Sequence, residues 1–200
     1  SPNITTEKKN EYLRIIQGET ARLSRLIDNV LDLAKIERGV KDYNFEQTEL
    51  NEIVSSVLSA MEYQIKMNDF TLEVFLSPVQ LPIYADKDAI EEALINLISN
   101  SIKYSQENKK ITITTYNEGT YPAISIKDKG IGISTQDRQR IFEPYERLNN
   151  EHVKSKSGTG IGLSVVKHIV QAHHAEIDIK SESGEGTEFV IIFVNFSSRN

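Results

Sequence analysis

Residues 89–104 read AIEEALINLISNSIKY, and this stretch decides the fold because it combines a core-facing stripe with two asparagines one helical turn apart. The apolar residues recur at spacings of three and four, which predicts an amphipathic helix buried along Ile90, Leu94, Leu97, Ile98 and Ile102. The opposite side, within an arc of about 100°, carries Asn96, Asn100, Lys103 and Tyr104. Asparagine is a poor residue for a helix interior because its amide competes for backbone hydrogen bonds. Two of them in one column therefore suggest a site.

The column has a chemistry that suits a nucleotide phosphate and its metal. Amide oxygens are neutral hard ligands for Mg²⁺, which usually keeps several waters and is also held by substrate phosphates. Lys103, one turn beyond Asn100 on the same face, would neutralise such phosphates. When the column is taken alone, a solvated helix face is the simpler explanation.

A second candidate element is the run Asp128-Lys-Gly130-Ile-Gly132. Strand side chains alternate between faces, so Asp128 continues the core-facing row of Ile124 and Ile126 and needs a hydrogen-bond donor. The amino group of adenine would donate to it, whereas guanine would present another acceptor. The two glycines would let a ligand approach the backbone closely. A turn that ends the strand is the alternative.

Two further glycine-rich runs follow. Gly158-Thr-Gly160-Ile-Gly162-Leu163 comes directly before a predicted helix, where free N–H groups and the helix dipole favour an anion. It is neither a P-loop nor a dinucleotide fingerprint. Gly184-Glu-Gly186-Thr187 is fully explained as a hairpin turn.

Composition limits the function classes. The chain has 200 residues, 38% hydrophobic and 26% charged, which is typical of a soluble globular protein with a real core. A net charge of -6 argues against binding to nucleic acid or to an anionic membrane surface. There is no cysteine, hence no disulfide or thiolate metal site, and a reducing cytoplasmic setting fits. No apolar run approaches the ~20 residues of a membrane span.

The remaining elements predict an α+β fold, a two-layer sandwich with helices on one face of a mixed sheet. Helices are expected at 50–67, 89–104, 135–142 and 161–174, and strands at 70–76, 83–85, 111–116, 123–127, 176–181 and 188–194. Ahead of them, Thr5–Arg38 reads as one long helix with a three-four apolar stripe from Leu13 to Ala34. We expect this stripe to pack on another helix, upstream or in a second chain; packing on its own domain is the alternative.

The order of these elements resembles the catalytic and ATP-binding domain of bacterial sensor histidine kinases, within the GHKL superfamily that includes gyrase and MutL. The matching boxes are 96–105 (NLISNSIKYS), 128–132 (DKGIG), 141–147 (IFEPYER), 158–163 (GTGIGL) and 184–187 (GEGT). The resemblance covers residues 45–196, with a lid at about 129–159. Residues 1–40, with DNVLDLAKIE at 28–37, resemble the second helix of the family's dimerisation and histidine-phosphotransfer hairpin.

The resemblance implies a role for each matching position. Mg²⁺ would be held by Asn100, and phosphoryl transfer would depend on Asn96, Lys103 and Arg147. Residues expected at the ATP share a place in one of the boxes: Asn100, Lys103, Tyr104, Asp128, Gly130, Gly132, Phe142, Gly158, Thr159, Gly160, Gly162, Leu163 and Thr187. Tyr145 stands where the family often has Phe, which weakens the expectation for lid packing there.

Asn96 favours a kinase over an ATPase. Hydrolysing relatives commonly carry a Glu four residues before the metal-binding Asn, as a general base for water, and an amide has no basic form near pH 7. The resemblance therefore implies transfer of the γ-phosphate of ATP to a histidine, for relay to an Asp of a response regulator receiver domain. A non-catalytic nucleotide-binding module and a GHKL-type ATPase are the alternatives.

The acceptor histidine is expected on a helix upstream of residue 1. The family's acceptor lies in a His-Glu/Asp-x-x-x-Pro-like setting that none of His152, His168, His173 and His174 has, so we interpret these as surface or packing residues. The intact protein is expected to dimerise through the full hairpin. It is expected in the cytoplasm, with membrane anchoring of the full-length chain left open and no membrane contact from these residues.

Overall fold

The structure is a computed structural model that describes residues 41–105, 107–147 and 159–194, with scattered positions between residues 5 and 38. The chain divides into two units, Ser1–Lys41 and Asp42–Asn200. At the described positions from Lys8 to Lys35 the first unit is helical. The described large apolar side chains of its stripe are exposed, from 43% at Val30 to 60% at Ile16, and Ala34 is half-buried. The expected packing partner of this stripe stays a prediction.

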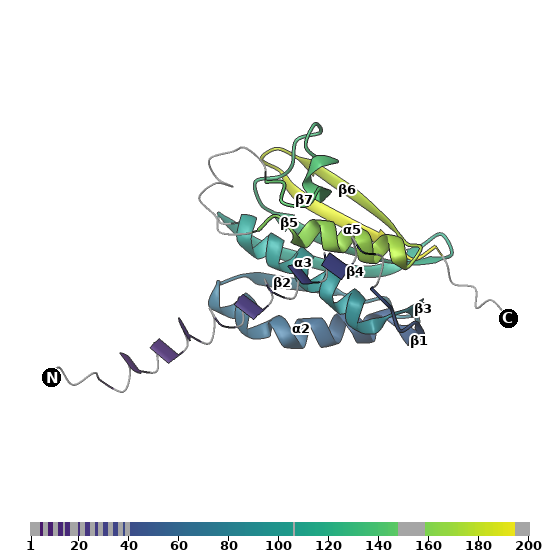
Figure 1. The fold of residues 1–200 in the computed structure, drawn as a ribbon, viewed down its shortest axis with the longest axis horizontal. Helices are drawn as coiled ribbons and strands as arrows, with labels where there is room; N and C mark the ends of the chain where they lie inside the picture. The colour runs from purple at the N-terminus through teal and green to yellow at the C-terminus, as the bar shows by residue number, and fades with distance from the viewer. Residues whose placement is uncertain are drawn as a thin grey trace. The chain divides into compact units, whose positions relative to one another are not determined.

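The second unit contains every helix and strand for which the structure gives bounds. In chain order these are β1 (Glu46–Glu49), α2 (Leu50–Met67), β2 (Thr71–Phe75), β3 (Pro82–Ala85), α3 (Lys87–Tyr104), β4 (Asn108–Glu118), β5 (Tyr121–Lys129), η1 (Arg140–Phe142), α5 (Gly162–Ala172), β6 (Glu176–Glu182) and β7 (Gly186–Ile192). Figure 1 shows their arrangement.

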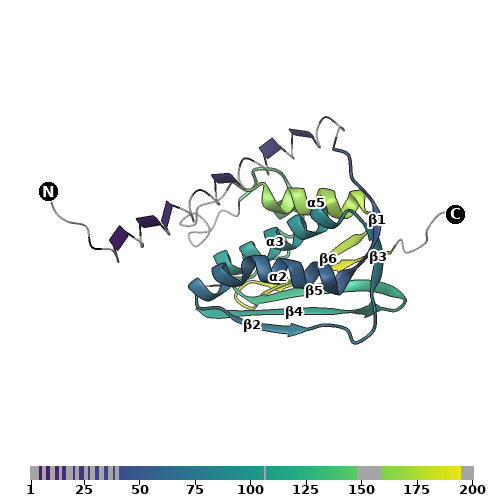
Figure 2. The ribbon, with the colours of Figure 1, turned by 90° about the horizontal axis from the view of Figure 1, so that it is seen from below.

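Five strands form a mixed sheet in the order β2-β4-β5-β7-β6. β2 runs parallel to β4, and the other neighbouring strands are antiparallel. Figure 2 shows α2, α3 and α5 together in a layer on one face of this sheet. The predicted two-layer α+β sandwich is therefore confirmed.

Helix α3 has the predicted capping and burial. The side chain of Asp86 caps it, with Oδ1 accepting from the amide of Ala89 at 3.0 Å. Every residue predicted for its apolar face is buried: Ile90, Leu94, Leu97, Ile98 and Ile102. Burial of about 1.5–3 kcal/mol per large apolar side chain makes this face the main reason that the helix stays on the sheet.

Two local predictions differ from the structure. A helix was expected near 135–142, but residues 135–139 form turns and only η1 is helical, as a 3₁₀ turn. Glu143 is extended at φ −73° and ψ 137° because the following Pro144 disfavours the helical region, so the turn cannot continue.

The segment before α2 was expected to be a linker, but it contains β1, which pairs with β3 in a separate two-stranded sheet. Glu49 fixes it there. Its carboxylate caps α2 through the amide of Glu52 at 3.0 Å and accepts from the amide of Leu81 at 2.8 Å. The polar β1 sequence has no apolar alternation, so its pairing could not be predicted locally.

No helix in the described parts of the chain is both long enough and apolar enough to cross a membrane.

Candidate functional site

Asp128 lies at the end of β5, in the inward-facing row predicted from the sequence, and is only 6% exposed. Its Oδ1 accepts from the amide of Gly130 at 2.8 Å and from the amide of Thr187 at 3.2 Å. Its Oδ2 accepts from the hydroxyl of Ser101, on α3, at 3.1 Å. The carboxylate thus joins β5, β7 and α3.

The electrostatics of Asp128 suit a ligand that donates hydrogen bonds. Burial raises the pKa of its carboxyl, and hydrogen bonds from Gly130, Ser101 and Thr187 oppose that rise. Among the described residues, no cation forms an ion pair with it. A buried carboxylate stabilised only by neutral donors gains from one more donor, such as an amino group.

The two glycines after Asp128 allow the backbone to pack against the protein itself. A Cβ on Gly130 would lie 2.7 Å from both the Ser105 hydroxyl and the Tyr104 carbonyl oxygen. Gly132 has φ +66°, and its Cβ would lie 1.8 Å from the carbonyl oxygen of Glu182. Close approach of a ligand to these glycines stays a prediction; the structure adds a second reason for them, because α3 and β6 occupy the space that a Cβ would fill.

The polar column of α3 is half-buried, in contrast to the fully buried stripe behind it. The ammonium of Lys103 lies 4.7 Å from the centre of the Tyr104 ring. Asn96 faces α5, because a Cβ on Gly162 would lie 3.1 Å from the Asn96 amide oxygen. Asn100, half-buried, stands on the helical turn between Asn96 and Lys103. Three of the predicted phosphate and metal residues therefore share one helix face, and Asn96 places one part of it beside the start of α5.

Two described residues of the predicted lid lie near different helices, Arg147 near α3 and Phe142 near α5. Burial raises the pKa of the Tyr104 phenol, and the positive charge of Arg147 acts in the opposite direction, so Arg147 lies near the end of α3. The ring of Phe142 lies 5.9 Å from the ammonium of Lys167 on α5. The predicted lid residue Gly158, together with His152, falls outside the described residues.

A backbone hydrogen bond connects the described part of the predicted lid to the second glycine run. The amide of Tyr145 donates to the carbonyl of Gly160 at 3.1 Å. Gly160 has φ +76°, and a Cβ on it would lie 2.8 Å from the carbonyl carbon of Tyr145. Tyr145 itself has φ +64° and a 63% exposed side chain. The Tyr145 side chain, at the position where the family often has Phe, therefore faces solvent.

The start of α5 provides backbone donors for an anion. The N-cap residue Ile161 makes no side-chain cap hydrogen bond, so the cap side chain does not satisfy the first amides of α5. Such amides and the helix dipole attract phosphate. Thr159 and Leu163, also predicted to bind nucleotide, are half-buried on either side of this point.

The last glycine box, 184–187, packs against Asp128 and the residues that follow it. Gly186 has φ +94°, and a Cβ on it would lie 2.2 Å from the carbonyl oxygen of Asp128. The amide of Gly184 donates to the carbonyl of Ile131 at 2.7 Å. The hairpin turn therefore holds both Asp128 and the first glycine box, through contacts that the sequence did not indicate.

Two polar residues of the site were missed in the sequence. Ser101 is 1% exposed and donates to Asp128. Ser181 is 7% exposed and accepts from the amide of Ile133 at 2.8 Å. Both had the signal that identified Asp128, a polar residue within a core-facing row: Ser101 on the apolar side of α3, and Ser181 after Ile177 and Ile179 on β6.

Residues 85–197 match the protein family described as "Histidine kinase-, DNA gyrase B-, and HSP90-like ATPase". The chain belongs to this ATPase family. The resemblance to sensor histidine kinases is confirmed by relatives and structures that carry that description. The chain therefore contains an ATPase domain of the type found in sensor histidine kinases.

Individual sensor proteins and a solved structure are similar to this chain over nearly its whole length. Drug sensory protein A of Synechocystis is 34% identical over 94% of the chain, and a sensor-like histidine kinase of Rhizobium meliloti is 28% identical over 94%. The chain spans 29% and 36% of the length of these two relatives, respectively. The solved structure of the Acinetobacter baumannii histidine kinase AdeS has a TM-score of 0.71 and 28% identity, over 92% of this chain and 84% of AdeS.

Proposed function

We propose that this chain is the catalytic, ATP-binding part of a protein-histidine kinase, with Asp42–Asn200 as the catalytic unit. It binds ATP and transfers the γ-phosphoryl group to a histidine of the phosphotransfer hairpin. The histidine then passes the group to an aspartate of a response regulator receiver domain. We propose that residues 1–40 are one helix of that hairpin, through which the intact protein dimerises in the cytoplasm.

Asn96 is the observation that supports a kinase most directly. Its amide oxygen faces Gly162 at the start of α5, where the first amides of that helix, uncapped by the Ile161 side chain, attract a phosphate. A general base at this place would activate water, and an amide cannot take up a proton near pH 7. The γ-phosphoryl group is therefore kept from hydrolysis and is passed to a protein side chain.

Asp128 supports adenine as the base. The buried carboxylate accepts only from neutral donors, so the amino group of adenine adds a favourable hydrogen bond, whereas guanine would bring an unpaired acceptor. Tyr104 would pack beside the base, and Thr187 would lie at its edge.

The donor set fits a magnesium ion that is bound mainly by phosphates. Asn100 offers one neutral amide oxygen, and no group of three acidic, histidine or cysteine ligands gathers among the described residues. Mg²⁺ is commonly held by one or two protein ligands together with substrate phosphates and water. When bound, it would neutralise charge on those phosphates. Lys103 and Arg147 add positive charge at the same helix end.

The test uses labelled ATP, Mg²⁺ and a separate peptide that carries the phosphotransfer helix with its histidine. We expect acid-labile label on the peptide, and no label when its histidine is replaced by Ala. Asn100→Ala should lower transfer about a hundredfold and weaken the dependence of nucleotide binding on Mg²⁺. Release of inorganic phosphate without labelling would instead indicate an ATPase, and tight ATP binding without either product would indicate a binding module.

A further inference from the structure

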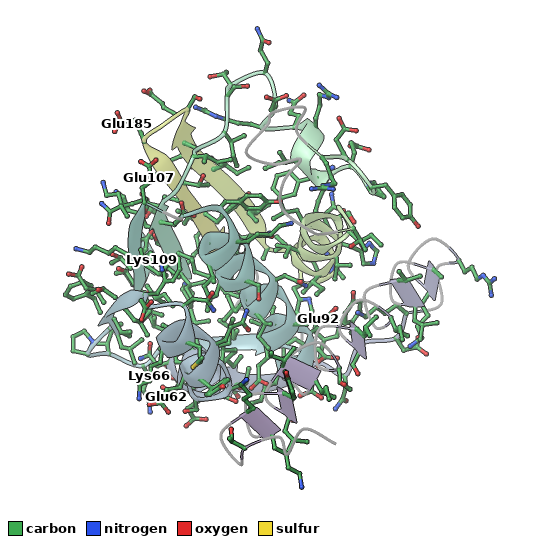
Figure 3. The ribbon with its side chains drawn as sticks, turned by 90° about the vertical axis from the view of Figure 1, so that its left-hand side faces the viewer. Glu62, Lys66, Glu92, Glu107, Lys109 and Glu185 are labelled. Carbon is green, nitrogen blue, oxygen red and sulfur yellow. The ribbon has the colours of Figure 1, made fainter. Side chains whose placement is uncertain are left out.

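Ser181 is a buried hydroxyl in β6, and its register partner across the hairpin is Thr187 on β7. It follows Ile177 and Ile179 in the less exposed row of this strand. Glu185, labelled in Figure 3, marks the turn that joins these two strands. Ser181 therefore lies at the end of the hairpin that closes the site.

The three hydrogen bonds of Ser181 determine where each proton points. Its hydroxyl lies 2.7 Å from the carbonyl oxygen of Gly186, 2.8 Å from the amide of Ile133 and 3.0 Å from the hydroxyl of Thr187. A carbonyl only accepts, so the single proton of Ser181 is donated to Gly186. The hydroxyl of Thr187 must then donate to Ser181.

The bond to Gly186 acts on Asp128 through one peptide group. The carbonyl of Gly186 and the amide of Thr187 belong to the same planar unit, and that amide donates to Asp128 at 3.2 Å. Ser181 and Asp128 thus hold this peptide from opposite sides. Gly186 adopts φ +94°, which only glycine reaches easily, so the peptide has little steric restraint of its own.

The bond from Ile133 extends the same chain of donors. It runs from the amide of Ile133 to Ser181, from Ser181 to Gly186, and from the amide of Thr187 to the carboxylate. Each hydrogen bond is donated in the direction that leads along the chain to Asp128, and hydrogen bonds aligned in this way strengthen one another. Arg138 donates to the carbonyl oxygen of Ser181 and fastens the start of the lid to the same residue.

We infer that Ser181 is a positioning residue that makes this corner of the site select adenine. It orients the peptide that holds Asp128, and it uses the only proton of the Thr187 hydroxyl. Both Asp128 and Thr187 then offer only acceptors to a ligand, which favours an amino group and disfavours the carbonyl of guanine. This inference rests on the proposed function, because it assumes that Asp128 reads the base.

The experiment measures the equilibrium affinity of the chain for non-hydrolysable ATP and GTP analogues at fixed Mg²⁺. Ser181→Ala should bind the ATP analogue about fivefold to tenfold more weakly, the loss expected for one buried hydrogen bond. Its affinity for the GTP analogue should hold or rise, because Thr187 regains a free proton. Ser181→Thr, which keeps a hydroxyl, should restore the ATP preference. Ser183→Ala is the matched control, since Ser183 is exposed in the same hairpin.

Equal loss of affinity for both analogues in Ser181→Ala would overturn the inference and leave Ser181 a structural role only. So would a Ser181→Thr protein with the same ATP-to-GTP ratio as Ser181→Ala. If Ser181→Ala does not fold, Thr187→Val is measured in its place. A lower ratio of ATP-analogue to GTP-analogue affinity than in the wild type supports the inference, and an unchanged ratio overturns it. Failure of the proposed function is distinct, because the wild-type chain would then show no preference for the ATP analogue.

Discussion

The hydroxyl of Ser101 donates to Oδ2 of Asp128 at 3.1 Å, and this bond connects the helix of the polar column to the strand of the buried carboxylate. Ser101 directly follows Asn100, so a fixed Ser101 also fixes the neighbouring amide relative to Asp128. This side-chain pair thereby connects the proposed base site to the proposed phosphate site.

Asp128→Asn tests whether this carboxylate recognises the base. The amide introduced there would keep one acceptor oxygen but lose the charge, so we expect ATP to bind about ten- to a hundredfold more weakly, the range for a hydrogen bond to a charged group. The ratio of the affinity for ATP to the affinity for GTP should fall at the same time. Calorimetric titration with both nucleotides measures this, and Asp69→Asn, an exposed carboxylate, is the matched control. Unchanged affinity would remove Asp128 from the base site.

Lowering the pH should weaken nucleotide binding through Asp128. Burial raises the pKa of its carboxyl, so the carboxyl takes up a proton at a pH above the ordinary pKa of about 3.9. The protonated oxygen can then no longer accept a hydrogen bond from the base. Binding of an ATP analogue, followed by calorimetric titration, should therefore fall as the pH drops through the raised pKa. This component should be absent in Asp128→Asn, which separates it from titration of the phosphates. The same pH dependence in both proteins would contradict the prediction.

Gly132→Ala should destabilise the chain far more than the same change at Gly119. Both glycines have positive φ, at +66° and +63°, and for alanine that conformation costs about 1–2 kcal/mol. A Cβ at 119 meets nothing within 4 Å, whereas at 132 it meets the carbonyl oxygen of Glu182. We expect the free energy of unfolding, measured with urea, to fall by about 1–3 kcal/mol more for Gly132→Ala than for Gly119→Ala. Equal losses would mean that the loop shifts freely.

Asn96→Glu should raise ATP hydrolysis. The carboxylate would lie near the first amides of α5, which favour its ionised form, and the ionised form is the one that can act as a base. We expect phosphate release to rise about tenfold or more, below the roughly 10²–10⁴ of an optimised general base. Asn96→Gln, which lengthens the side chain without adding a base, is the control and should leave hydrolysis unchanged. A flat rate in both proteins would count against the kinase argument.

Arg147→Ala should slow transfer more than it weakens binding of ADP. Arg147 lies near Tyr104 and is proposed to reach the terminal phosphate, which ADP lacks. We expect transfer to fall about ten- to a hundredfold, with ADP affinity within about threefold. Arg140→Ala removes another lid guanidinium, one that pairs with Asp137 and Glu146, and serves as the comparison. Equal losses for transfer and for ADP binding would place Arg147 elsewhere.

Periodicity determined most of the fold. The bounds of α2 at 50–67 were predicted to the residue, and the Asp86 cap of α3 was predicted at its position, because both depend on neighbours within one helical turn. The inward position of Asp128 followed from strand alternation. The pairing of β1 with β3 was missed, because its cause is Glu49 bonding to Leu81, which lies 32 residues away.

The sequence by itself determined which features are candidates for the chemistry: an amide column without a base, a carboxylate in an apolar row, and glycines ahead of a helix. The tertiary structure decided what those features pack against. Gly130 and Gly132 are small because α3 and β6 occupy the space beside them, and Asp128 is held by Ser101 and Thr187 from two other elements. A local pattern records the period and the polarity of a segment, but long-range contacts depend on which elements the sheet brings together, and that information is distributed over the whole chain.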